Sequence, residues 1–115
     1  MMYNEPSPQK YIAGENMNII DELKALPFAV NVEKDKDGIY VETEEFSSAY
    51  SEEATLEESL QALAKNMKSW GRAVGDDIDR WRQGRENELP YLLKILVSSE
   101  EELLACLKSS RLVNI

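Results

Sequence analysis

Histidine is absent from the 115-residue sequence, and the only cysteine is Cys106. The absence of histidine excludes histidine general bases, Ser-His and Cys-His nucleophilic systems, and histidine metal sites. A single cysteine excludes an intramolecular disulfide, which is typical of a cytoplasmic protein. No other nucleophilic side chain has a candidate base beside it. We therefore expect no catalytic residues, no metal site and no cofactor.

Basic residues and long hydrophobic runs are also scarce. The sequence contains 13 basic and 22 acidic residues, which gives a formal net charge of -9. Because phosphate binding needs a basic face, this balance argues against DNA or RNA as the main partner and favours a basic protein. No apolar run reaches the length of a membrane span, and the start of the sequence lacks the pattern of a signal peptide. We expect a cytoplasmic protein without membrane contact.

The apolar residues that are present, 43% of the total, suffice for one modest core. Residues 1–15 are polar and are interrupted by Pro6, Pro8 and Gly14. They predict a flexible N-terminal arm. The remaining residues, 16–115, predict a single domain.

The hydrophobic period of the next segment changes from that of a helix to that of a strand. Apolar residues at positions 19, 20, 23 and 26 share one helical face and predict a short helix that ends before Pro27. Residues 28–33 and 39–44 alternate between apolar and polar, and "DKDG" lies between them. Gly38 in this motif can take the positive φ of a hairpin turn. We expect a β-hairpin here and a third strand over residues 46–50.

Residues 55–81 carry the strongest helical period in the sequence. Thr55 and Glu58 have the spacing of an N-terminal capping box. Apolar residues then recur every three or four positions on one seam: Leu56, Leu60, Leu63, Met67, Trp70, Val74, Ile78 and Trp81. This spacing predicts one helix of about seven turns, with a weak point at Gly75.

Two shorter helices are expected after residue 84. Pro90 suits the first turn of one, and Ser98 or Ser99 can cap the other, which has Lys108 near its end. Together these elements predict an α+β fold. In this fold a small antiparallel sheet of two or three strands packs on one long helix, with short helices flanking it.

Acidic residues are concentrated in one part of the sequence. Residues 41–64 contain seven glutamates and no lysine or arginine. Glu57 and Glu58 are explained by helix initiation, because carboxylates stabilise the first turn of a helix. The other five glutamates are either a solvated surface or a face for a basic protein. The tryptophans of the long seam are expected in the core, with an interface role as the alternative. The candidate partner-binding residues are therefore Glu42, Glu44, Glu45, Glu52, Glu53, Trp70 and Trp81.

Two motifs that follow the predicted hairpin carry a family resemblance. "TLEES" at residues 55–59 and "LPY" at residues 89–91 resemble the Phd-like antitoxins of RelE/RelB-type toxin–antitoxin systems. The first half of the sequence is also similar to the HicB-like antitoxin fold. The resemblance covers residues 26–97 and implies a non-enzymatic protein that neutralises a toxin by direct contact. It also implies that the toxin is a basic RNase.

Two other functional classes are open alternatives. One is a structural or scaffold domain that forms a homodimer through the seam containing Trp70 and Trp81. The other is a hydrolase that uses its carboxylates. Direct DNA binding is not expected, because residues 1–15 are too few to form a separate DNA-binding module.

Overall fold

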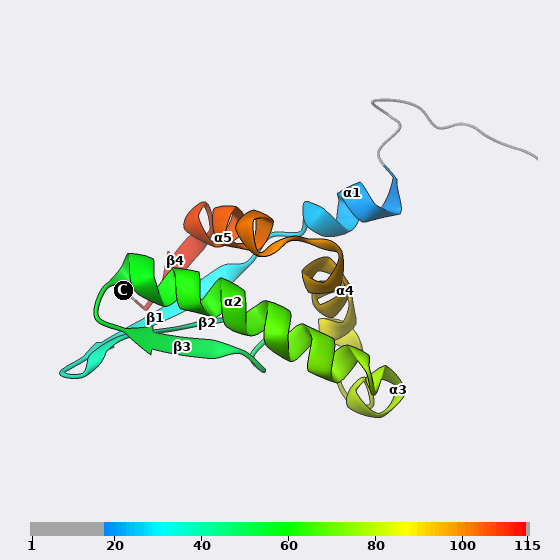
Figure 1. The fold of residues 1–115 in the computed structure, drawn as a ribbon, viewed down its shortest axis with the longest axis horizontal. Helices are drawn as coiled ribbons and strands as arrows, with labels where there is room; N and C mark the ends of the chain where they lie inside the picture. The colour runs from blue at the N-terminus through cyan, green and yellow to red at the C-terminus, as the bar shows by residue number, and fades with distance from the viewer. Residues whose placement is uncertain (1–17, 115) are drawn as a thin grey trace, which may run out of the picture.

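A computed structural model describes residues 18–114 as a four-stranded sheet with helices packed against one of its faces (Figure 1). The sheet order is β3-β2-β1-β4. The predicted α+β fold, with one long helix and shorter flanking helices, is confirmed. The elements follow one another in the order α1 (Ile19–Lys24), β1 (Ala29–Asp35), β2 (Gly38–Thr43), β3 (Tyr50–Glu53), α2 (Leu56–Gly75), α3 (Ile78–Trp81), the 3-10 helix η2 (Glu86–Glu88), α4 (Leu89–Val97), α5 (Glu100–Lys108) and β4 (Arg111–Val113).

Strands β1 and β2 form the predicted hairpin. They pair antiparallel, and Asp35 lies opposite Gly38. One carboxylate oxygen of Asp35 accepts hydrogen bonds from the backbone amides of Asp37 (2.7 Å) and Gly38 (3.1 Å), which is how aspartate stabilises a turn. Gly38 has a φ of 150°, a conformation that other residues rarely adopt. A side chain at this position would also clash with the carbonyl oxygen of Glu53 in β3.

The third strand lies later in the sequence than predicted. Residues 46–49 form a turn, and β3 begins only at Tyr50. The turn is held by Thr43, whose hydroxyl donates to the carbonyl oxygen of Phe46 (3.1 Å) and accepts from its amide (3.2 Å). Phe46 is fully buried. The predicted bounds of this strand were wrong because Phe46 enters the core from a turn.

The fourth strand was not predicted. Strand β4 pairs in parallel with β1, with Ala29 opposite Arg111 and Asn31 opposite Val113. A strand of three residues is too short to produce a recognisable alternation. Its pairing with β1 is a contact between segments far apart in the sequence, which local patterns do not reveal.

Helix α2 begins as predicted and ends early. The hydroxyl of Thr55 accepts from the amide of Glu58 (3.1 Å), and it also meets the Glu58 carboxylate (3.2 Å). In a reciprocal capping box the Glu58 carboxylate would accept from the backbone amide of Thr55. Here it accepts from the Thr55 hydroxyl instead. The helix ends at Gly75 and a separate helix starts at Ile78, so the prediction of one continuous helix was wrong. The break follows the glycine that was expected to be the weak point.

The buried side of α2 includes Met67, Gly71 and Val74 but leaves out Trp70, which is 46% exposed. Helix α4 approaches α2 at Gly71, where an added Cβ would lie only 2.7 Å from the Cγ2 atom of Ile95. This close approach turns the packed side of α2 toward Gly71. Trp70 is rotated away from the core as a result.

Helix α1 is attached less closely than its sequence suggests. Asn18 caps it by accepting from the amide of Asp21 (2.9 Å). Ile19 is 66% exposed and Ile20 is 44% exposed, so the predicted buried face is wrong for these two residues. Helix α1 packs against α4, and its Leu23 is half-buried.

Two lysines satisfy helix carbonyl groups that would otherwise lack partners. The buried Lys94 of α4 donates to the carbonyl oxygen of Lys24 at the end of α1, and its ammonium lies 5.4 Å from the ring centre of Phe28. Lys68 of α2 donates to carbonyl oxygens at the end of α4. Burial lowers the pKa of Lys68. These contacts join the helices on the covered side of the sheet.

Candidate partner-binding surface

No helix among residues 18–114 packs on the face of the sheet opposite α2 and α5 (Figure 1). Because side chains alternate along a strand, this face is separate from the buried face that carries Val30, Val32 and Val41. We call it the open face. Its side chains are Ala29, Asn31, Glu33 and Asp35 of β1, Tyr40 and Glu42 of β2, Tyr50 and Glu52 of β3, and Arg111 and Val113 of β4.

Two stacked tyrosines lie on the open face. The ring centres of Tyr40 and Tyr50 are 5.7 Å apart, and the ring planes meet at 26°. The hydroxyl of Tyr40 donates to a carboxylate oxygen of Glu42 (3.1 Å). Burial, together with the hydrogen bond and charge of Glu42, raises the pKa of Tyr40 to about 12. The Tyr40 hydroxyl therefore holds the Glu42 carboxylate in place.

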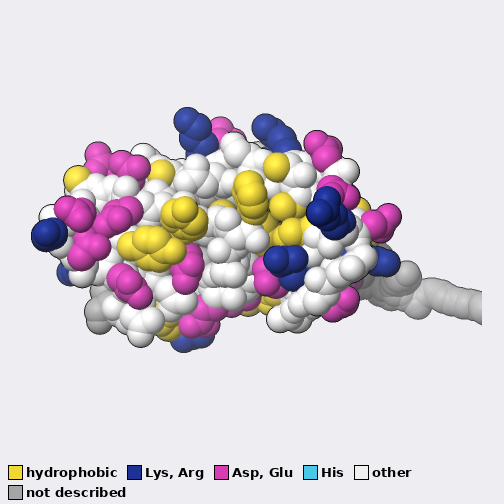
Figure 2. Space-filling view, turned by 90° about the horizontal axis from the view of Figure 1, so that it is seen from below, with side chains coloured by type: hydrophobic (Ala, Val, Ile, Leu, Met, Phe, Trp, Pro, Cys, Tyr) yellow, Lys and Arg dark blue, Asp and Glu magenta, His cyan; other side chains and the backbone are white. Residues whose placement is uncertain are grey.

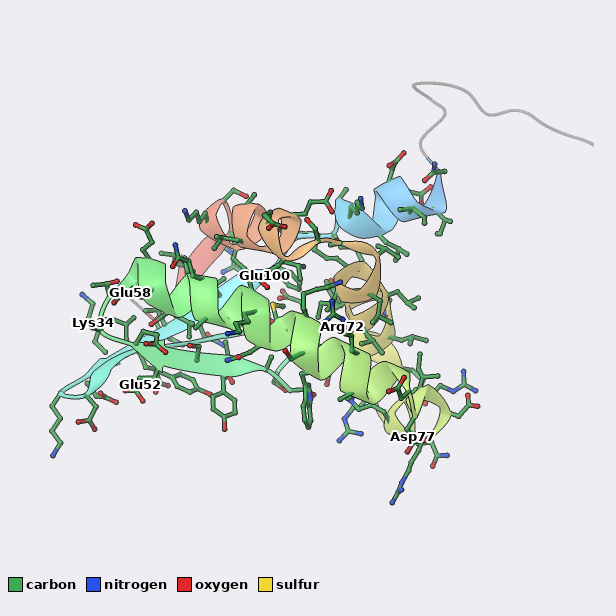
Figure 3. The ribbon with its side chains drawn as sticks, in the orientation of Figure 1. Lys34, Glu52, Glu58, Arg72, Asp77 and Glu100 are labelled. Atoms are coloured by element: carbon green, nitrogen blue, oxygen red, sulfur yellow. The ribbon has the colours of Figure 1, made fainter. Side chains whose placement is uncertain are left out.

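Carboxylates surround these tyrosines. In the register of the sheet, Tyr40 lies between Glu33 on β1 and Glu52 on β3, and Tyr50 lies opposite Glu42. The neighbouring Asp35 carboxylate, which can accept a hydrogen bond from the protonated Glu52 carboxyl, raises the pKa of Glu52, and burial and the charge of Asp35 add to this effect. This raised pKa indicates a concentration of negative charge near the hairpin. Figure 3 places Glu52 beside β3 at the hairpin end of the molecule, far from Asp77 at the opposite end.

A groove lies between the start of β3 and α2. It has a volume of about 520 Å³ and is lined by Ser48, Ala49, Tyr50, Asn66, Ser69 and Trp70. Tyr50 is 60% exposed, and the 46% exposure of Trp70 places a second large aromatic side chain on the groove. The side chain of Asn66 donates to the backbone carbonyl oxygen of Tyr50 (2.8 Å), which ties the strand to the helix. We call this the aromatic groove.

A second groove of about 390 Å³ shares Trp70 with the aromatic groove and also involves Trp81 and Arg85. The guanidinium carbon of Arg85 lies 5.8 Å from the ring centre of Trp81. Figure 2 shows the molecule from below, with hydrophobic side chains gathered across the middle of the view and acidic side chains around those at the sheet end. Several basic side chains lie toward the other end.

The two tryptophans named as candidate partner-binding residues have different environments. Trp81 is half-buried, and its ring centre lies 6.0 Å from that of Phe46, so it packs against the core as expected. The expectation of core packing was wrong for Trp70, which is exposed on the aromatic groove. A binding role for either tryptophan stays a prediction.

The five glutamates named as candidate partner-binding residues do not share one surface. Glu42 and Glu52 lie on the open face. Glu53 is exposed at the end of β3, at the strand position that alternates to the other side of the sheet. Glu44 and Glu45 follow β2 in a bend, and Glu45 accepts from the backbone amide of Ala29 at 3.0 and 3.2 Å. The Glu45 carboxylate is therefore occupied within the fold.

Sequence reasoning missed Tyr40 and Tyr50. A signal for Tyr40 exists, because it precedes Glu42 by two residues in an alternating strand and so must share its face. Tyr50 could not be placed in the same way, because the bounds of its strand were predicted wrongly.

Residues 18–114 contain no group of three or more acidic or cysteine side chains placed to hold a metal ion. None of the helices in this part of the protein is both long and apolar enough to cross a membrane.

No protein-family model matches this sequence, and no curated protein matches it significantly. One solved structure is similar in fold: an antitoxin part of a candidate toxin/antitoxin system from Syntrophomonas wolfei subsp. wolfei. The TM-score is 0.66 at 22% sequence identity, and the match covers 76% of this chain. It covers 65% of the chain of that protein, so the present sequence spans slightly less than two thirds of its length. At this identity the likeness concerns the fold.

Proposed function

We propose that this protein is an antitoxin-like protein that binds a basic toxin and neutralises it by direct contact, without catalysis of its own. The observation that carries the proposal is the shared fold with the Syntrophomonas antitoxin, at a TM-score of 0.66 over 76% of this chain. The net charge of -9 adds support, because an acidic protein attracts a basic partner over long distances.

The proposed mechanism is steric and electrostatic. A toxin that cleaves RNA needs a basic surface for phosphate groups, and carboxylates can occupy the positions of those groups. Glu42 and Glu52 on the open face are suited to this role, because both are held beside aromatic rings at defined strand positions. Glu45 is less suited, because it already accepts a backbone hydrogen bond.

The test is co-expression in bacteria with the product of the neighbouring reading frame. We expect that product alone to arrest growth and this protein to restore growth. We also expect the two purified proteins to form a stable complex whose association slows as ionic strength rises. Loss of rescue without loss of folding in a variant with both Glu42→Lys and Glu52→Lys would place the contact on the open face.

The two alternative functions predict different results for the same purified protein and the same co-expression experiment. A scaffold domain would sediment as a homodimer and would neither bind the neighbouring product nor rescue growth. A hydrolase would show nuclease or phosphatase activity that changes when divalent ions are added or removed. Either result in place of rescue would contradict the proposal.

A further inference from the structure

We infer that the aromatic groove and the adjoining open face receive an arginine-bearing basic segment of a protein partner. This inference rests on the proposed function for the class of partner, and it adds the side chain that is recognised and the place where it binds. The aromatic groove consists of the six lining residues defined above, from Ser48 on the turn before β3 to Trp70 on α2.

The shape and chemistry of the groove favour arginine. Tyr50 and Trp70 carry large, exposed aromatic rings, and the other lining residues are small or polar. A guanidinium group is planar and stacks on aromatic rings, and it is more weakly hydrated than the ammonium group of lysine. A groove of about 520 Å³ has room for a long side chain together with part of the backbone that carries it.

The charge beside the groove has the required sign. Glu42 lies directly opposite Tyr50 on the neighbouring strand, and Glu52 lies opposite Tyr40. A guanidinium stacked on Tyr50 would therefore have a carboxylate within reach for a charge-assisted hydrogen bond. The basic side chain on the open face is Arg111, which lies on β4 at the other edge of the sheet. It does not neutralise the carboxylates next to the groove.

The surface is organised before any partner arrives. Tyr40 holds the Glu42 carboxylate through a hydrogen bond of 3.1 Å and stacks on Tyr50. Asn66 fixes the backbone of Tyr50 to α2. A surface that is already ordered loses little conformational entropy on binding, so more of the contact energy appears as affinity.

A second copy of this chain fits the surface less well than a basic partner does. Each copy carries a formal charge of -9, so two copies repel each other. Nucleic acid is disfavoured for the same reason. The charge complement of the open face is a basic protein segment.

The inference can be tested with two synthetic peptides of equal length and charge, one alternating arginine with glycine and the other lysine with glycine. Binding to the full chain is measured by titration calorimetry and by the shifts of backbone amide NMR signals. We expect the arginine peptide to bind at least about threefold more tightly than the lysine peptide, because its guanidinium groups stack on the aromatic rings. The NMR shifts should map to β3 and α2.

Variants then locate the contact. Tyr50→Ala, Trp70→Ala and Glu42→Gln should each weaken the arginine peptide about threefold or more. Glu101→Gln is the matched control, since it makes the same charge change at an exposed position on α5, and it should leave the affinity unchanged. Circular dichroism should confirm that all four variants are folded.

Three results with the peptides or with the free protein would overturn the inference. They are equal binding of the two peptides, an effect of Glu101→Gln as large as that of Glu42→Gln, and sedimentation as a dimer that Trp70→Ala dissociates. The proposed function can fail separately. If the neighbouring product does not bind while the arginine peptide still binds through the groove, the antitoxin proposal fails and the groove inference stands. If that product binds the wild type and the three groove variants equally, the antitoxin proposal stands and the groove inference fails.

Discussion

The ammonium group of Lys68 in α2 lies 2.6 Å from the carbonyl oxygen of Ser98 and 3.0 Å from that of Ile95. It thereby satisfies backbone carbonyl groups where α4 ends. Lys68→Met should lower the free energy of unfolding by about 1–3 kcal/mol, because these part-buried carbonyl groups would lose their hydrogen-bond donor. Urea denaturation measures the change. Lys65→Met is the control, since Lys65 is exposed on the same helix, and it should change stability by less than about 0.5 kcal/mol. Equal effects of the two substitutions would contradict a capping role for Lys68.

Tyr40 should titrate with a pKa of about 12 in an absorbance titration near 295 nm. Burial is the largest cause and Glu42 adds to it, so Glu42→Gln should move this pKa down toward the ordinary value of 10.0. Because the pKa is raised in the folded state, the associated stability is present in full below pH 10 and is lost as the pH rises through 12. Glu101→Gln should leave the titration unchanged. If Glu42→Gln left the titration curve unchanged, Glu42 would not contribute to the raised pKa of Tyr40.

Two glycines of α2 should respond to alanine in opposite ways. A Cβ at Gly75 would lie 3.6 Å from Leu96, which is ordinary contact, so Gly75→Ala should stabilise the protein by about 0.5–1 kcal/mol through helix propensity. A Cβ at Gly71 would overlap the Cγ2 atom of Ile95, so Gly71→Ala should cost about 1–3 kcal/mol through overpacking. Thermal unfolding of the two variants gives the signs. A gain in stability for Gly71→Ala would mean that α4 does not approach α2 this closely.

Loss of the N-cap of α2 should lower the free energy of unfolding less than loss of a side chain from its buried face. Thr55→Ala removes the side-chain acceptor of the Glu58 amide and should cost about 1 kcal/mol. Leu63→Ala removes a fully buried side chain and should cost about 2–5 kcal/mol, depending on how far the cavity collapses. Denaturant midpoints compare the two. If Thr55→Ala were the more damaging change, the assignment of the core face of α2 would be wrong.

Glu102 should contribute to acid sensitivity. Its carboxylate accepts from the backbone amide of Ser99 (2.8 Å) and pairs with Lys24 (3.1 Å), and these contacts lower its pKa below the ordinary value of 4.5. Because the folded-state pKa is depressed, this contribution is present above pH 4.5 and is lost as the pH falls through the lowered value. Glu102→Gln should reduce the loss of stability over that range. The check is a set of denaturation curves from pH 6 to pH 3, with Glu101→Gln as the control.

The sequence by itself determined the elements whose causes are local. The hairpin at Gly38 follows from turn chemistry that involves four neighbouring residues. The start of α2 at Thr55 follows from a side chain that caps an amide three residues away. The break after Gly75 occurs where helix propensity is weakest. The sequence also showed the concentration of glutamates between residues 41 and 64. It did not show that these glutamates lie on different surfaces.

Only the tertiary structure decided the features that depend on contacts between distant segments. Strand β4 exists because residues 111–113 meet β1 at the edge of the sheet. Trp70 is exposed because Gly71 admits α4 and turns the packed side of α2 away from the tryptophan. Glu42 and Glu52 share the open face, whereas Glu45 bonds to Ala29, because the path of the chain after β2 assigns each carboxylate its neighbours. Hydrophobic period identifies which side of a helix or strand is apolar, but packing against distant residues determines which part of that side is buried.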